Sequence, residues 1–236
     1  GRQPDNYYRI CVTVPTNVVK LNGGVLPTSS FINNFYYQFK NSNASGTNSP
    51  APNLIESDKP VLEAQYCTTQ GQDGNPNFSG ANSNGIGGDP EMIYLSPVEQ
   101  TINNITLYSA TKNLIVQSYI NVIIKNAGVP SFKLDGILKS SSFSLHPQDN
   151  NYSYAILTVT PGSHNLYSDT GFNAIAYGFG SAESYGYNAG TNIRDFTPVA
   201  TFQNPYGRID SAVTCANTPL QFSVPLSFVP STIKWD

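Results

Sequence analysis

Charged residues are scarce in this sequence of 236 residues. Lysine and arginine together number 12 and aspartate and glutamate 15, so charged residues make up 11% of the chain, against roughly 25% in an ordinary soluble domain. The net charge of −3, without a cluster of lysine and arginine, excludes the basic surface that binds nucleic acid or anionic lipid. The apolar runs are also far shorter than the ~18 residues of a membrane span, so we expect no membrane insertion.

Cysteine and histidine are equally rare. The three cysteines, Cys11, Cys67 and Cys215, are too few for a disulfide-built scaffold and lack the C-x-x-C spacing of zinc and redox sites. The two histidines, His146 and His164, are isolated, and we interpret His164 as bonding back to the backbone. The G-x-S-x-G and phosphate-binding glycine motifs are missing as well. We therefore expect no metal site, no cofactor and no catalytic residues.

Small neutral polar residues and aromatic residues take the place of the missing charge. Asparagine, serine and threonine number 26, 25 and 18, and the chain has 15 tyrosines, 12 phenylalanines, 19 glycines and 17 prolines. Aromatic and β-branched residues favour strands, and glycine and proline favour the turns between them. This composition predicts an all-β fold. A surface rich in Asn, Ser, Thr and Tyr is typical of secreted proteins, so we expect a secreted or cell-surface location.

Four short segments of the first half recur in the same order in the second half. The offsets between matched segments range from 110 to 113 residues, which indicates an internal duplication. Each copy contains a tight hairpin turn, at Asn22-Gly23 and at Asp135-Gly136, because these residues tolerate positive φ. We predict two tandem, duplicated antiparallel β-sandwich units of jelly-roll-like form. The matched segments are 10–14 with 120–124, 20–23 with 133–136, 29–31 with 141–143, and 57–66 with 168–177.

The duplication divides the chain into four parts. We predict a first β-sandwich repeat at residues 1–75, a Gly/Asn-rich linker or loop at 76–90, a second repeat at 91–197 and a short C-terminal β segment at 198–236. The strand expected at 102–108 has no counterpart in the first repeat, so either that strand is lost or another segment supplies it. We interpret the glycine-rich stretch at residues 71–90 as a solvated loop, with a calcium loop built on Asp73 and Asp89 as the alternative.

An aromatic run in the second repeat is the candidate binding site. Tyr177 and Phe179 share one face of an expected strand, and Tyr185 and Tyr187 alternate with small residues that leave ring faces uncovered. Together with Asn188, these rings are suited to stacking on a sugar or anchoring a protein. The alternative is that the rings cover the end of the sheet or the interface between the repeats. We expect the partner to be a glycan or an extracellular protein.

Residue alternation also predicts a disulfide bond within the first repeat. The apolar positions 10, 12 and 14 alternate inward and leave Cys11 on the opposite face, and inward positions 62, 64 and 66 likewise leave Cys67 outward. If the two strands are neighbours, the sulfurs can bond and stabilise the repeat by about 2–4 kcal/mol. Cys215 then remains unpaired.

Two functions of different class fit these features. The first is a non-catalytic adhesion or ligand-binding module. The alternative is a glycoside hydrolase or its accessory carbohydrate-binding domain, and hydrolysis requires two carboxylates that face each other across a cleft. Asp58 and Asp169, at equivalent places in the two repeats, are interpreted as turn-forming residues rather than catalytic ones. The carboxylates whose positions decide between the two functions are Asp135, Asp149, Asp169, Glu183 and Asp195.

Two groups of motifs resemble a known family. Residues 135–190 contain D-G-x, G-x-H and Y-G-F-G followed by S-Y-G-Y-N-A-G, and residues 59–66 contain K-P-V followed by Q-Y. Over residues 8–195 the chain resembles the IgG-Fc-binding-protein N-terminal domain family. The resemblance implies a module of a large secreted, surface-displayed protein, so we expect a monomeric fragment of a multidomain chain. Residues 215–236 resemble the opening strands of a PKD-type immunoglobulin-like repeat.

Overall fold

The chain is built from antiparallel strands. A computed structural model describes residues 5–42, 51–67, 89–110, 115–180, 183–192, 201–209, 217–224, 232 and 234. The all-β prediction is confirmed, because the helices in these ranges are three short 3-10 segments and the sheets are antiparallel throughout. No helix in the described ranges is both long enough and apolar enough to cross a membrane. The 3-10 segments are Thr28–Ser30, Asn126–Ser131 and Ser140–Ser142.

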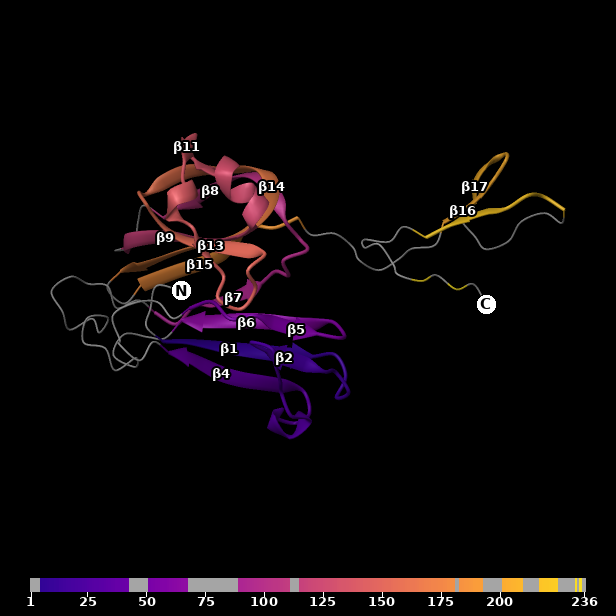
Figure 1. Cartoon of the computed structure of the whole chain (residues 1–236), viewed down its shortest axis with the longest axis horizontal. Coiled ribbons are helices and arrows are strands. Elements are labelled where there is room, and N and C mark those ends of the chain that lie inside the picture. Colours follow the sequence, from indigo (N-terminus) through magenta and orange to yellow (C-terminus); the bar gives the residue numbers. More distant parts are fainter. Residues whose placement is uncertain are drawn as a thin grey trace. The chain divides into compact units, whose positions relative to one another are not determined.

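Two compact units divide the chain, residues 1–192 and residues 193–236. The larger unit contains two sets of strands, which we name the first region, residues 5–95, and the second region, residues 102–190. Figure 1 shows the strands of the first region in indigo and purple and those of the second region in pink and orange. The strand β7 (Met92–Leu95) pairs with β6 (Val61–Cys67), so the first sheet continues past the predicted linker at 76–90.

The first region has two sheets around a small core. The larger sheet has the order β4 (Tyr36–Ser42), β1 (Asp5–Val12), β6 and β7, and the smaller has β3 (Gly24–Val25), β2 (Val19–Leu21) and β5 (Ile55–Ser57). Four side chains that are at most 9% exposed form the centre of this core. They are Ile10, Val12, Val19 and Phe31.

The second region is held together by one long strand, β14 (Gly162–Gly180). The first part of β14 pairs with β8 (Ile102–Ser109) and β10 (Lys133–Leu134), and its last part pairs with β9 (Ile115–Lys125) and β15 (Glu183–Gly190). A register shift between Tyr167 and Phe172 separates the two parts. The remaining strands are β11 (Ile137–Leu138), β12 (Ser144–Leu145) and β13 (Tyr152–Val159).

The two regions have the same strand order. In the first region β4-β1-β6-β7 matches β13-β9-β14-β15 of the second, and β3-β2-β5 matches β11-β10-β14. The hairpin turns agree in detail, because Asn22 and Asp135 both have φ of 52° and each is followed by a glycine of positive φ. The side chain of each also accepts a backbone N–H, that of Leu54, just before β5, at 2.9 Å and that of Asn165, in β14, at 2.8 Å.

One strand distinguishes the regions. In the second region, β8 pairs with the first part of β14. In the first region, β5 corresponds to the first part of β14. Among the described strands β5 pairs only with β2, so no described strand takes the place of β8. The continuous strand β14 is also replaced by two strands, β5 and β6, separated by Asp58-Lys59-Pro60.

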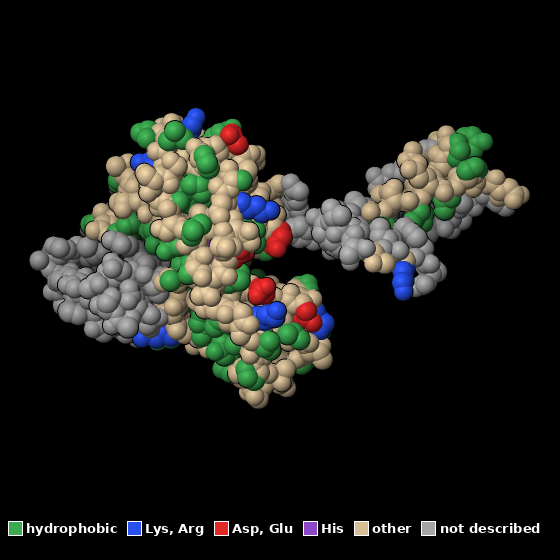
Figure 2. All heavy atoms as spheres, in the orientation of Figure 1, with side chains coloured by type: hydrophobic (Ala, Val, Ile, Leu, Met, Phe, Trp, Pro, Cys, Tyr) green, Lys and Arg blue, Asp and Glu red, His purple; other side chains and the backbone are tan. Residues whose placement is uncertain are grey.

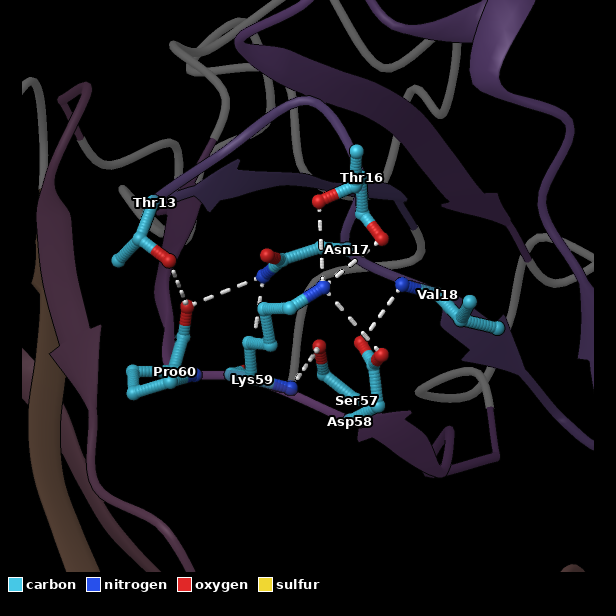
Figure 3. A network of polar contacts seen from close by, with 8 residues as sticks. All are labelled: Thr13, Thr16, Asn17, Val18, Ser57, Asp58, Lys59 and Pro60. Atoms are coloured by element: carbon cyan, nitrogen blue, oxygen red, sulfur yellow. Dashed lines mark hydrogen bonds and ion pairs between the residues drawn. The ribbon is translucent and has the colours of Figure 1, made fainter.

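A polar network holds the break between β5 and β6 against the turn that follows β1 (Figure 3). The Lys59 ammonium donates to the backbone oxygen of Thr16 at 3.0 Å and lies 3.5 Å from Asp58. Asp58 accepts the backbone N–H of Val18 at 2.7 Å, which lowers the pKa of its carboxyl. Asp58 therefore has a structural role, but through a bond to a residue 40 positions away rather than through the local turn bond that the sequence predicted.

The predicted disulfide is contradicted by the strand register. The strands β1 and β6 are neighbours, but Cys11 lies opposite Leu62 and Cys67 lies opposite Asn6 at the other end of the pair, and both cysteines are free. The assignment of faces on β6 was also reversed. Leu62 is 51% exposed, whereas Cys67 is 6% exposed. Cys215 lies outside the described residues.

In the smaller unit, the described residues form one sheet. Its order is β17 (Gly207–Ile209), β16 (Thr201–Asn204) and β18 (Gln221–Ser223), and the rings of Phe202 and Phe222 lie 5.3 Å apart. These strands lie within residues 198–236, where the sequence predicts a short C-terminal β segment.

Candidate functional site

Two sheet faces meet between the regions of the larger unit. The first-region face carries residues of β1, β6 and β7, and the second-region face carries residues of β9, β13 and β14. At one end they close on an apolar cluster in which Cys67 joins Tyr119, Tyr177 and Phe179 of the second region. The ring centroids of Tyr119 and Tyr177 lie 5.4 Å apart.

A cavity of about 340 Å³ lies beside this cluster, within the range of small-ligand sites. Both regions line it, so neither region forms the cavity alone. Three tyrosines and several aliphatic side chains supply the walls. The lining includes Tyr8, Leu95, Ile123, Tyr152, Tyr154 and Ile175.

The strand pairing shows that the first region has polar side chains here where the second region has apolar ones. Val61 lies opposite Val12, as Phe172 lies opposite Ile124, so positions two and four residues later correspond as well. Glu63 and Gln65 thus stand where the second region has Ala174 and Ala176, both at most 2% exposed in its apolar core. The same pairing aligns Val12 of β1 with Ile124 of β9, an offset of 112 residues. The sequence match of residues 10–14 with 120–124 has an offset of 110.

Glu63 is the unusual group of the cavity. Its carboxyl makes no hydrogen bond or ion pair within the described part of the chain, and burial raises its pKa to about 7. Burial, with Glu63 close by, also raises the pKa of the Tyr8 hydroxyl. Gln65, in contrast, donates to Asn6 at 2.9 Å.

The cavity has a negative character. Glu63, Glu99 and Asp149 all line it, and no described lysine or arginine does. His146 is its one histidine, and burial lowers the pKa of this imidazole despite the hydrogen bond with the Asn53 backbone. His146 is therefore neutral at pH 7 and leaves the carboxylates without a compensating cation.

The predicted aromatic site is divided by the structure. Tyr177 and Phe179 are 3% and 1% exposed within the inter-region cluster, so they offer no ring face to a ligand, and the alternative interpretation holds for them. Asn188 lines the cavity and donates to Ser96 at 2.6 Å.

Tyr185 and Tyr187 lie on the other face of β15, with stacked rings 6.2 Å apart. The Tyr185 ring lies over Gly178, where a Cβ would clash with it, and its hydroxyl donates to Ser118 at 3.0 Å. Tyr187 donates to the backbone oxygen of Tyr108 at 2.7 Å and is 36% exposed. These two rings therefore support β8 and β9, and Tyr187 keeps an accessible edge.

Sequence reasoning missed an aromatic face on the outer side of the β4-β1-β6-β7 sheet. Strand alternation gathers there Tyr7, Arg9, Tyr36, Leu62, Tyr66 and Tyr94. The Arg9 guanidinium lies between two rings, 4.5 Å from the centroid of Tyr36 and 5.5 Å from that of Tyr66. Leu62 and Tyr94 are 51% and 52% exposed. Charged side chains are sparse on the molecular face shown in Figure 2.

The histidines and most of the carboxylates have structural partners. His164 lies 2.7 Å from both Asp135 and the Thr160 backbone oxygen, and His146 Nδ1 accepts two backbone N–H groups. Asp169 accepts the Tyr167 hydroxyl at 2.7 Å. Of the five carboxylates named above, Asp149 alone lines the cavity among the described ones, and Asp195 lies outside the described residues.

The described residues also contain no group of acidic, cysteine and histidine side chains that could hold a metal ion. For the calcium-loop alternative, Asp73 lies outside the described residues, and the backbone of Asp89 pairs with the Ser184 hydroxyl at 2.7 Å.

The larger unit is thus an all-β module with an internal cavity and an aromatic sheet face. The pattern of the family described as IgGFc binding protein matches residues 1–178, which run from the start of the chain into the last part of β14. The chain belongs to this family. Comparisons with curated proteins and with solved structures found no match.

Proposed function

We propose that the larger unit is a non-catalytic extracellular binding module that recognises a partner protein with its outer aromatic face, the face of Tyr7, Arg9, Tyr36, Leu62, Tyr66 and Tyr94. Membership of a family described as binding immunoglobulin Fc is the observation that carries the proposal. It favours a protein partner over a glycan, and a secreted or surface-displayed location.

The composition of this face supports the assignment. Tyrosine and arginine are the residues that dominate the energy of protein interfaces, and the Arg9 guanidinium contacts two rings and donates to Gln38 at 2.8 Å. A pre-ordered side chain loses little entropy on binding. The glycoside hydrolase alternative receives less support, because Asp135 and Asp169 are engaged in structural hydrogen bonds.

An array of extracellular proteins and glycans, with immunoglobulin Fc among them, tests this proposal. We expect a protein to bind, and we expect the Leu62→Ser/Tyr94→Ser variant to bind it roughly tenfold more weakly or worse with an unchanged melting temperature. The control is Tyr185→Ala/Tyr187→Ala, which alters the face predicted from the sequence. If the control variant loses binding while the first retains it, or if only glycans bind, the proposed face is wrong.

A further inference from the structure

The cavity between the two regions carries an inference that does not depend on the outer face. We propose that it binds an organic ammonium group, with the Glu63 carboxylate as the ion-pair partner. The group is either that of a free amine or that of a lysine side chain on a partner.

Charge is the first argument. The three carboxylic residues that line the cavity, Glu63, Glu99 and Asp149, have no lysine or arginine beside them among the described lining residues. Glu63 is half-buried and has no ion-pair partner among the described residues, and partial desolvation of a carboxylate is costly, so a cation that enters the site removes part of that cost. An anionic ligand would be repelled by these carboxylates, because no described lysine or arginine lines the cavity to pair with it.

The walls supply the second argument. Tyr8, Tyr152 and Tyr154 line the same space, and tyrosine rings attract ammonium groups through their π faces. Aliphatic side chains such as Ile123 and Ile175 complete the lining and provide contact for an alkyl chain. The combination of carboxylate, rings and aliphatic wall fits an alkylammonium better than a polyhydroxylated sugar.

The comparison between the regions supplies the third argument. Glu63 stands where Ala174 stands in the second region, so the framework common to both does not require a carboxyl at this place. A half-buried acid in a cavity, which the shared framework does not need, is a mark of a functional site.

Binding is expected to depend on pH through Glu63. The ionisable groups that line the cavity around it are Tyr8, Glu99, His146, Asp149, Tyr152 and Tyr154. The pKa values of the Tyr8 and Tyr152 hydroxyls are raised and the pKa of His146 is lowered, whereas Glu63, with a pKa of about 7, changes charge near neutral pH. Only its ionised form pairs with an ammonium, so affinity is expected to rise with pH.

The test titrates the whole chain with n-butylammonium chloride, butan-1-ol and sodium butyrate, followed by amide chemical shifts in NMR. We expect saturable binding of the ammonium alone, with shifts at Glu63 and its neighbours. A lysine blocked at both backbone ends distinguishes the sources: if it also binds, a partner's lysine fits the cavity, and if it does not, the source is a free amine.

Two variants and two pH values complete the test. Glu63→Gln is expected to bind butylammonium roughly tenfold more weakly, whereas Glu56→Gln, at an exposed position on β5, is expected to bind as the parent does. With a pKa of about 7 and a neutral side chain that binds roughly tenfold more weakly, affinity is expected to be about sevenfold lower at pH 5.5 than at pH 8. Equal binding of butanol, unchanged binding by Glu63→Gln, or no saturable binding in the folded parent chain overturns the proposal.

Discussion

The first and second regions share a strand order but cover their sheets differently. In the second region, β8 pairs with the first part of β14. The core of this region includes Phe132, Leu166 and Phe172, which are fully buried. In the first region β5 has no second partner strand among the described residues, and the core is limited to four well-buried side chains. Part of the first-region sheet face is covered by the second region instead. The described strands of the first region thus include no counterpart of β8, and this coincides with an inter-region cavity and with polar side chains on an inward face.

The largest expected effect compares the two cores directly. Phe172 is fully buried and packs edge-on against Phe132 at 5.4 Å, so Phe172→Ala is expected to lower the free energy of unfolding by about 3–5 kcal/mol. Val61 is its half-buried counterpart in the first region. The substitution Val61→Ala should lower the free energy of unfolding by only about 1 kcal/mol. Urea denaturation measures both. Equal losses would show that the first-region core is not the weaker of the two.

A smaller effect is expected where the hairpin turns differ. Asn22 donates to Asn53 at 2.8 Å in the first region, and Asp135 pairs with His164 at 2.7 Å in the second. Burial alone would lower the pKa of His164, but its hydrogen bonds to Asp135 and Thr160 raise it overall. Burial would likewise raise the pKa of Asp135, but the hydrogen bonds from His164 and Asn165 lower it overall.

The signs of these shifts define a pH window. A raised imidazole pKa stabilises the fold below the unfolded value and this contribution is lost as pH rises, whereas a lowered carboxyl pKa stabilises it above the unfolded value. The free energy of unfolding of the parent should therefore be about 1 kcal/mol higher than that of the Asp135→Asn/His164→Asn variant. This value is modest because Asp135 is 44% exposed. The advantage should be largest between about pH 4 and 6.5. Parallel stability curves of parent and variant from pH 4 to 8 would refute a charged pair.

Local sequence signals predicted the parts of this fold that depend on neighbouring residues. The turns at Asn22-Gly23 and Asp135-Gly136 were predicted because their backbone needs positive φ. The ring pair Tyr177 and Phe179 was also placed correctly on one face.

Long-range packing decided what the sequence left open. Alternation cannot tell which face of a strand a second sheet will cover, so it predicts a binding surface at Tyr177 and Phe179, which are buried between the regions. On β6 the more apolar positions proved to be outward, because the inward positions include Glu63 and line a cavity. The polar inward positions were the one signal in the sequence that could have indicated the cavity.

The smallest expected effect concerns the cysteines. Cys67 corresponds to Gly178 and is buried against the second region, where burial raises the pKa of its thiol to about 11. Cys11 is half-buried at the other end of the strand pair. Because the thiolate is the reactive form, iodoacetamide at about pH 8 should alkylate Cys11 of the folded Cys215→Ser chain well before Cys67, as mass spectrometry of peptides would show.

Two controls sharpen this comparison. Unfolding in guanidinium chloride should make the two cysteines react at similar rates, because burial then no longer suppresses ionisation of the Cys67 thiol. Cys67→Gly, which introduces the residue of the second region, should leave the rate at Cys11 unchanged. Faster alkylation of Cys67 than of Cys11 in the folded chain would mean that the two regions separate in solution, since Cys67 can become reactive only when the cluster with Tyr119, Tyr177 and Phe179 opens.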